Sequence, residues 1–220
     1  MKKMIILILI AFSLSKDLIL IGDSRIKEMA NVIFEIENSY YASGYLPYHS
    51  PMTTEPVSYE DYNIHVTAPE KIDHIFTGAP NDSVHFQLKS AKPGTNVLLN
   101  LGIDNLNLLD DIIIFYGKLA DKYYKLNFYI ISLIGVDETK IDISNSRVKE
   151  FNAYIKNRIL EVEFDNLKYK NILKGEDPTQ IMIDDEPVDI LKYSTDGIGF
   201  YRNGLTRIFK AMVEGLEFES

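Results

Sequence analysis

The chain contains no cysteine, which excludes disulfide bonds, thiol catalysis, and zinc or iron–sulfur sites held by cysteine. Basic residues are also few, because 23 Lys and Arg stand against 32 Asp and Glu and give a net charge of −9. Nucleic acids and anionic membrane surfaces both require a basic footprint, so we expect neither as a partner. No internal repeat or low-complexity linker divides the 220 residues, whose length and 46% hydrophobic content suit one globular domain.

Several ligand-binding motifs are missing as well. The glycines form no phosphate-cradling loop. The acidic residues between 184 and 189 lack the glycine and the alternation of a calcium loop, so we interpret them as an exposed turn. The aspartates and histidines between residues 61 and 74 match no zinc-ligand spacing. We therefore predict no metal and no cofactor.

The first fifteen residues differ from the rest of the chain. Residues 1–3 (Met-Lys-Lys) are a short basic start, residues 4–12 are an unbroken apolar run, and residues 13–15 are small or apolar. This pattern predicts a signal peptide over residues 1–15, too short to span a bilayer, followed by a secreted or extracytoplasmic domain over residues 16–220. The alternative is that residues 4–12 form a buried strand. After removal of the signal peptide we expect no stable membrane insertion.

Beyond the leader, apolar runs alternate with segments of helical periodicity. Residues 18–21 are a short continuous apolar run, which is typical of a parallel strand buried on both faces. Residues 97–101 and 128–133 are rich in apolar residues, and we interpret them as a second buried strand and a third strand. Apolar residues with helical spacing follow them: Met29, Ile33 and Ile36; Leu108, Ile112, Phe115 and Leu119; Val148, Phe151, Ile155 and Ile159; and Leu205, Ile208, Phe209, Met212 and Leu216. This alternation predicts a single doubly wound α/β domain with a mostly parallel sheet, a flavodoxin-like three-layer sandwich.

Two regions do not follow this alternation. Residues 38–70 are rich in Tyr, Pro and Ser, and a loop of that length is usually functional or partly structured. Its tyrosines either stack on sugar rings or pack the loop onto the domain. Residues 161–195 contain one predicted strand, over 167–173, and otherwise acidic turns.

Three polar segments occupy the places where a doubly wound sheet binds ligands, beyond the carboxyl ends of its strands. Gly22-Asp23-Ser24 follows the first strand, residues 102–105 follow the second, and residues 196–200 precede the final helix. A serine that opens a helix has an exposed hydroxyl and a backbone N–H near the positive helix end, where a developing oxyanion is stabilised. The segments therefore indicate an acyl-transfer site, although Ser24 alone is also explained by a turn with an N-capping serine.

The order and spacing of these segments resemble the SGNH/GDSL hydrolase family, whose blocks are Gly-Asp-Ser, then Gly-x-Asn-Asp, then Asp-x-x-His. Residues 131–138 and 145–152 also resemble the family's stretch between its last two blocks. The resemblance implies an SGNH-hydrolase-like fold, with Ser24 as the nucleophile and Asp196 as the triad carboxylate. The expected reaction is hydrolysis of an acyl ester, and the expected partner is a small-molecule or carbohydrate ester.

The other family positions are altered. The oxyanion asparagine falls on Asp104, with Asn105 one place later, and the catalytic histidine falls on Gly199. Gly102 lines the predicted site, and His74 is the candidate for a substitute base. Because a carboxylate repels an oxyanion and glycine has no side chain, we expect the esterase activity to be weak or lost. The alternative is a secreted, non-catalytic protein that binds a ligand, such as a glycan, in the same cleft.

Overall fold

The computed structural model describes residues 16–36, 56–67, 83–104, 106–161 and 164–218. A six-stranded sheet has the order β2-β3-β1-β4-β5-β6, and all its neighbouring strands are parallel except β2, which pairs antiparallel with β3. The bounds of its strands are β1 Lys16–Gly22, β2 Val57–Tyr59, β3 Tyr62–Thr67, β4 Asn96–Asn100, β5 Asn127–Ile131 and β6 Leu167–Lys170. The predicted doubly wound α/β fold is confirmed.

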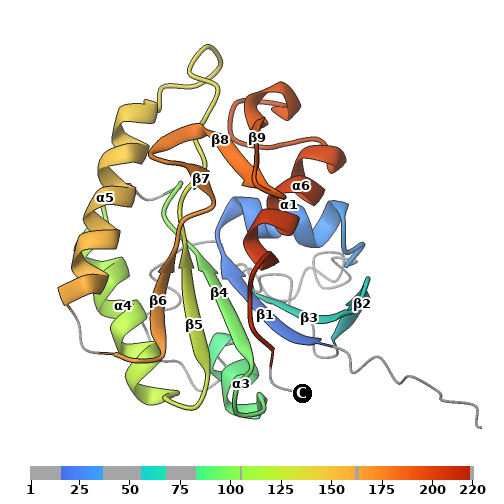
Figure 1. Cartoon of the computed structure of the whole chain (residues 1–220), viewed down its shortest axis with the longest axis vertical. Helices are drawn as coiled ribbons and strands as arrows, with labels where there is room; N and C mark the ends of the chain where they lie inside the picture. Colours follow the sequence, from blue (N-terminus) through green and yellow to red (C-terminus); the bar gives the residue numbers. More distant parts are fainter. Residues whose placement is uncertain (1–15, 37–55, 68–82, 105, 162–163, 219–220) are drawn as a thin grey trace, which may run out of the picture.

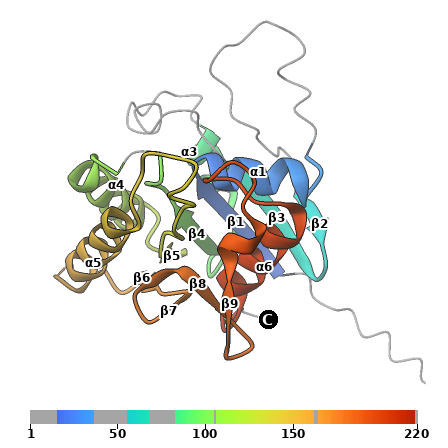
Figure 2. The ribbon, with the colours of Figure 1, turned by 90° about the horizontal axis from the view of Figure 1, so that it is seen from above.

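Helices cover both faces of this sheet (Figures 1 and 2). Helices α3, α4 and α5 pack on the face to which Ile19 and Ile21 of β1 point, and α1 and α6 pack on the face of Leu18 and Leu20. Apolar residues at every position of the strand are needed because both faces are covered. The helices are α1 Ser24–Val32, α3 Ser83–Ser90, α4 Leu109–Lys122, α5 Asn145–Glu161 and α6 Arg202–Val213.

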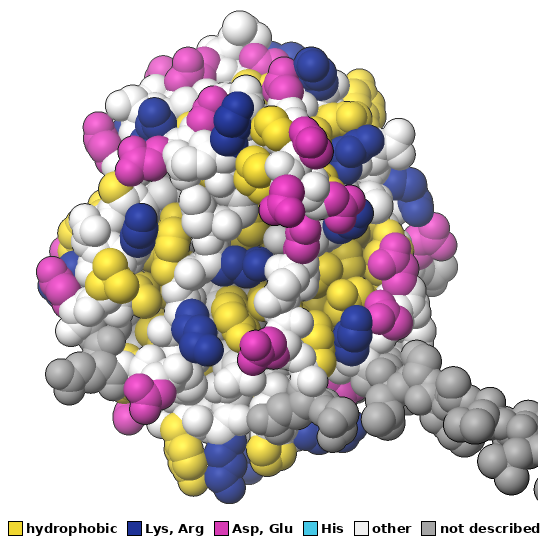
Figure 3. Space-filling model, viewed as in Figure 1, with side chains coloured by type: hydrophobic (Ala, Val, Ile, Leu, Met, Phe, Trp, Pro, Cys, Tyr) yellow, Lys and Arg dark blue, Asp and Glu magenta, His cyan; other side chains and the backbone are white. Residues whose placement is uncertain are grey.

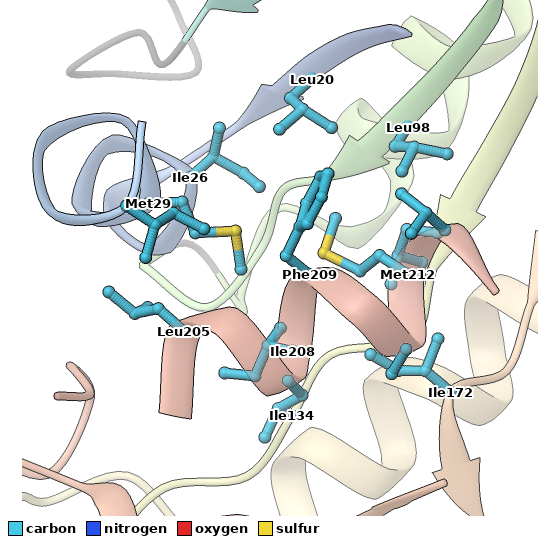
Figure 4. Packing of buried hydrophobic residues seen from close by; sticks show 14 of the residues in the cluster. Leu20, Ile26, Met29, Leu98, Ile134, Ile172, Leu205, Ile208, Phe209 and Met212 are labelled. Carbon is cyan, nitrogen blue, oxygen red and sulfur yellow. The ribbon is translucent and has the colours of Figure 1, made fainter. Parts of the chain in front are cut away.

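The core beneath α1 and α6 also positions the helix that carries Ser24. Figure 4 shows Phe209 and Met212 of α6 reaching toward Leu20, Leu98 and Met29 from the strands and from α1. The ring of Phe209 also lies edge-on to Phe34, Tyr59 and Tyr62, with centroids 5.2 to 5.8 Å away. This packing fixes the orientation of α1 and therefore of the residues at its first turn.

The prediction for residues 161–195 is wrong in one respect. These residues form a second, three-stranded antiparallel sheet of β7 Leu173–Lys174, β8 Asp177–Ile183 and β9 Glu186–Asp189, followed by the short 3₁₀ helix Ile190–Tyr193. The predicted strand over 167–173 ends at Lys170, and the chain then crosses to this sheet. Asp184 and Asp185, with φ of 50° and 64°, make the tight turn of the β8–β9 hairpin. Two apolar side chains of β8, Ile181 and Ile183, pack into the same core as α6.

The region 38–70 also contains more structure than a loop. Strand β3 lies beside β1 in the sheet, with His65 in register with Ile19. Tyr59 and Tyr62 pack against the core, so for these two tyrosines the packing interpretation is correct. The other tyrosines before residue 56, and residues 1–15, lie outside the described residues. Within the described part of the chain, no helix has both the length and the apolar character that a membrane span requires.

Candidate functional site

Four of the predicted site residues, Ser24, Asp104, Asp196 and Gly199, meet where β1 ends and α1 begins. Strand β1 lies between β3 and β4, and its two neighbours are reached by connections on opposite faces of the sheet. Doubly wound folds bind ligands at such a switch point. Ser24 is exposed and is the first residue of α1, whereas the N-cap is Asp23. The interpretation of Ser24 as an N-capping serine is therefore wrong, since its hydroxyl is directed elsewhere.

The Ser24 hydroxyl is bonded to a carboxylate. It donates to Asp104 Oδ1 at 3.0 Å, and the Ser24 backbone N–H donates to Asp104 Oδ2 at 3.1 Å. Asp104 thus lies at the positive N-terminal end of α1, where an anion is stabilised by the helix dipole. The Ser24 backbone N–H, which would stabilise an oxyanion in an esterase, is therefore already bonded to the carboxylate of Asp104.

Behind Ser24, the buried carboxyl of Asp23 fixes the loop that follows β4. Its Oδ2 accepts the backbone N–H groups of Gly102 and Ile103, both at 2.9 Å, while its Oδ1 is buried without a hydrogen bond. Burial, together with the nearby Asp104 charge, raises the pKa of Asp23 to about 6. Gly102 was predicted to line the site, but its N–H is directed to Asp23 and it is not among the residues that line the cleft.

Gly102 itself is required by its surroundings. Its φ is +133°, and a Cβ at this position would lie 2.4 Å from Cζ of Phe151. An L-residue rarely adopts this backbone conformation, and the buried ring of Phe151 leaves no space. The loop that carries Asp104 is therefore held in one path by Gly102 and by Asp23.

The raised pKa of Asp23 predicts a pH dependence of stability. Below about pH 4 the carboxyl is protonated in both the folded and unfolded states and has no effect. As the pH rises from about 4 to 6 the carboxyl ionises first in the unfolded chain, because its pKa is 3.8 there against about 6 in the folded chain. The free energy of unfolding therefore falls by about 3 kcal/mol over this range. We expect the free energy of unfolding of Asp23→Asn to lack this pH dependence. Urea unfolding at pH 4 to 7 measures it: the free energy of unfolding of wild type minus that of the variant should fall as the pH rises.

Asp196 provides the control for that experiment. The backbone N–H groups of Gly199 and Ile198 lower the pKa of Asp196. Its carboxylate therefore raises the free energy of unfolding at neutral pH, and this contribution is lost as the pH falls. The wild-type-minus-variant difference for Asp196→Asn should therefore stay nearly constant between pH 4 and 7 and fall only below about pH 4. Parallel curves for wild type and Asp23→Asn between pH 4 and 7 would contradict the assignment to Asp23.

Arg25 is the most buried charged side chain at the site, with 2% exposure. Its guanidinium donates to the backbone carbonyls of Ile134, Gly135 and Ile198 and lies 5.4 Å from the ring centroid of Phe200. Burial lowers its pKa to about 10, against the opposing effect of the Asp23, Asp104 and Glu28 carboxyls. Arg25 therefore joins α1 to the loops after β5 and before α6.

Glu28 occupies the space where the family histidine would begin. A Cβ at Gly199 would lie 2.8 Å from Glu28 Oε1 and 2.9 Å from Thr195 Oγ1. The other carboxylate oxygen of Glu28 accepts the Phe200 N–H at 3.1 Å. Half-burial is the main cause that raises the pKa of Glu28, with Asp196 adding to it. Sequence reasoning missed Glu28, although its position one helical turn after Ser24 places both side chains on one face of α1.

Asp196 stabilises its own turn. Its Oδ1 accepts the backbone N–H groups of Ile198 at 3.1 Å and Gly199 at 2.8 Å, as aspartates commonly do at turns. The side chain is exposed and lies on the rim of the cleft that contains Ser24. Its carboxylate accepts from backbone groups of its own turn and from Thr195, and among the described residues no imidazole bonds to it.

Neither histidine in the described part of the chain is at this site. His85 is on α3, and its Nδ1 lies 2.8 Å from the hydroxyl of Tyr123 at the far end of the sheet. His65 is in β3 beside Ile19. His74, predicted as a substitute base, and Asn105, predicted as a shifted oxyanion donor, lie outside the described residues.

The groups around Ser24 line one open cleft of about 370 Å³. This volume is within the range of small-molecule sites, roughly 300 to 1,000 Å³. Its walls come from the first two turns of α1, from Asp104 and from the segment before α6. The lining residues are Ser24, Arg25, Lys27, Glu28, Asn31, Val32, Asp104, Asp196, Ile198 and Gly199. Across the described residues, no group of three or more His, Asp or Glu is arranged to hold a metal ion.

The architecture matches solved structures. A proposed platelet activating factor from Streptococcus pneumonia is similar at a TM-score of 0.52 and 13% identity, over 90% of this chain and 82% of that one. A proposed GDSL-like lipase from Bacteroides ovatus is similar at a TM-score of 0.49 and 13% identity, over 93% of this chain and 55% of that one. No family model matches the sequence, and no curated protein does.

The fold is therefore SGNH/GDSL-like, as the motif order implied. At 13% identity this likeness concerns the arrangement of the chain. Ser24 opens the first helix at the switch point, and Asp104, Asp196 and Gly199 lie around the same cleft.

Proposed function

We propose that this chain is a non-catalytic relative of SGNH hydrolases that binds a neutral, hydroxyl-rich ligand in the Ser24 cleft. The observation that carries the proposal is the Asp104 carboxylate, which accepts both the N–H and the hydroxyl of Ser24. In an acyl-transfer enzyme the same N–H would stabilise the negative oxygen of the tetrahedral intermediate. With a carboxylate in its place, the intermediate is repelled instead of stabilised.

The missing base supports the same proposal. A serine nucleophile needs a group within hydrogen-bond reach to take its proton, and a third group to orient that base. The family's histidine position is Gly199, and Glu28 fills the adjoining space. Asp196, which would orient a histidine, is bonded to the N–H groups of its own turn.

The chemistry of the cleft favours a ligand that donates hydrogen bonds. Glu28, Asp104 and Asp196 line it, and ionised carboxylates are acceptors only. Sugar hydroxyls donate to carboxylates, and such charge-assisted bonds are stronger than neutral ones. An anionic ligand would meet three carboxylates against two basic side chains, Lys27 and the carbonyl-bonded Arg25, so we propose a neutral glycan. The leader-like residues 1–15 support an extracytoplasmic location, where such ligands occur.

The test combines labelling, turnover and binding. We expect no labelling of Ser24 by a fluorescent fluorophosphonate and no turnover of 4-nitrophenyl acetate, alongside an active serine esterase as the positive control. Neutral oligosaccharides, screened by calorimetry, should bind wild type, and Glu28→Gln should weaken binding about tenfold, since a hydrogen bond to a charged group contributes about 1.5 to 3 kcal/mol. The exposed Glu186→Gln of β9 is the matched control. Ser24-dependent labelling with turnover would refute the proposal, as would equal binding by Glu28→Gln.

A second candidate is a weak esterase in which Asp104 itself takes the proton from Ser24. The 3.0 Å contact between Ser24 Oγ and Asp104 Oδ1 has the geometry of a nucleophile and its base. The two candidates differ in the effect of Asp104→Asn. Removing a base abolishes turnover, whereas removing an obstructing carboxylate leaves turnover unchanged or raises it.

A further inference from the structure

A lysine-rich surface lies at the end of the sheet opposite the Ser24 cleft. It is formed by the turn between α3 and β4 and the turn between α4 and β5, which Figure 1 shows side by side below the strands. A backbone hydrogen bond from Gly94 N to Lys125 O, 2.8 Å long, joins the two turns. Between them is a hollow of about 180 Å³ whose lining includes Lys89, Pro93 and Lys122.

This surface concentrates positive charge on a chain whose net charge is −9. Lys89, Lys92, Lys122 and Lys125 are all exposed, and Tyr124 beside them is 69% exposed. The Lys125 Nζ lies 5.7 Å from the centroid of the Tyr124 ring. Figure 3 shows basic and hydrophobic side chains next to each other at this lower end of the molecule. We call these five residues the lysine–tyrosine surface.

The chain also enters the domain beside this surface. Lys92 Nζ forms an ion pair of 2.8 Å with Asp17 Oδ2, and Asp17 is the second residue of β1. The sequence that precedes β1 includes the apolar run of residues 4–12. The first residues of the domain that follows the predicted signal peptide therefore lie beside these basic and aromatic side chains.

We propose that the lysine–tyrosine surface docks on an anionic lipid bilayer. Lysines near such a bilayer are attracted by its negative surface potential, and tyrosine, with its apolar ring and polar hydroxyl, is enriched at the headgroup level. The net charge of the whole chain led us to expect no anionic membrane partner. Electrostatic attraction, however, acts only within a Debye length of about 8 Å, so the local charge of this surface decides whether it binds an anionic bilayer. A lipid surface is favoured over nucleic acid because the extracytoplasmic location, which this inference takes from the proposed function, brings the domain next to a membrane.

Co-sedimentation of the full chain with vesicles tests this proposal. We expect stronger binding to vesicles with 30% phosphatidylglycerol than to pure phosphatidylcholine, and loss of that preference in 0.5 M NaCl, where charges are screened. Each basic residue near the surface contributes about fivefold to partitioning. Lys122→Glu/Lys125→Glu should therefore weaken binding to the anionic vesicles by about 25-fold or more.

The matched control is Lys149→Glu/Lys156→Glu, which changes two exposed lysines on α5 and alters the net charge by the same −4. It should retain most of the preference for anionic vesicles. Equal loss in both double variants would overturn the proposal, because net charge rather than this surface would then decide binding. Equal binding of wild type to both vesicle types would also overturn it, as would tighter, Lys122- and Lys125-dependent binding to a single-stranded DNA oligonucleotide.

Discussion

The double variant Asp104→Asn/Gly199→His is expected to hydrolyse short-chain acyl esters at least about 100-fold faster than the background rate measured in the presence of wild type. The asparagine replaces the repelling carboxylate by an oxyanion donor, and one such donor is worth about 10²- to 10³-fold in kcat. The histidine supplies the missing base, and general base catalysis contributes about 10²- to 10⁴-fold. The measurement is the kcat/KM for 4-nitrophenyl butyrate.

The structure indicates what the new histidine must displace. Its Cβ would lie 2.8 Å from Glu28 Oε1, which is the end of a flexible side chain, so the triple variant with Glu28→Ala should be at least as active. Adding Ser24→Ala to the double variant is the control and should abolish the gain. No gain in either the double or the triple variant would mean that Ser24 is not in the position of a nucleophile. A loss of wild-type turnover in the single variant Asp104→Asn would instead favour Asp104 as a base.

Arg25→Met is expected to lower the free energy of unfolding by about 3 kcal/mol or more. The substitution preserves much of the side-chain volume but leaves three backbone carbonyls, of Ile134, Gly135 and Ile198, without their donor. It also leaves Asp23 and its neighbouring carboxyls without the buried positive charge. Removing one partner of a buried charge network typically costs about 3 to 5 kcal/mol. Urea unfolding at pH 7 measures the change.

Arg202→Met is the matched control for this prediction. Arg202 forms a 2.9 Å ion pair with Glu35, but both side chains are more than half exposed, and exposed pairs contribute about 0 to 1 kcal/mol. The control should therefore unfold at nearly the same urea concentration as wild type. If Arg25→Met does so too, Arg25 is not the residue that holds the three segments together.

The fold could be predicted from the sequence wherever an element is buried on both faces. Residues 18–21 and 97–99 are continuously apolar because helices cover both sides of β1 and β4. Strand β3 was missed because polar Asn63 and His65 interrupt it. The β7–β9 sheet was missed because its strands are short and present only one face to the core, which leaves few apolar residues to form a pattern.

The site could be predicted in part. Ser24, Asp104 and Asp196 come from three distant segments of the chain, and the fold brings them to one cleft. This agrees with the expectation that ligands bind beyond the carboxyl ends of the strands. Sequence reasoning missed Glu28 and Arg25. Arg25 is a charged residue next to an exposed serine, and nothing in a sequence distinguishes a guanidinium that faces water from one that bonds three buried carbonyls. That distinction depends on tertiary contacts with segments more than 100 residues away.

Strand β1 begins at Lys16, at the opposite end of the sheet from the cleft. An attachment through the residues before Lys16 would therefore determine which end of the domain faces the attachment surface. Strand β1 begins beside the lysine–tyrosine surface and ends at Gly22, directly before the residues of the cleft. Its seven residues rise about 3.3 Å each and span roughly 20 Å. A molecule attached at its lower end would therefore hold the cleft open to the surroundings, away from the attachment surface. A ligand displayed on a neighbouring cell or polymer would then reach the cleft without any rearrangement of the domain.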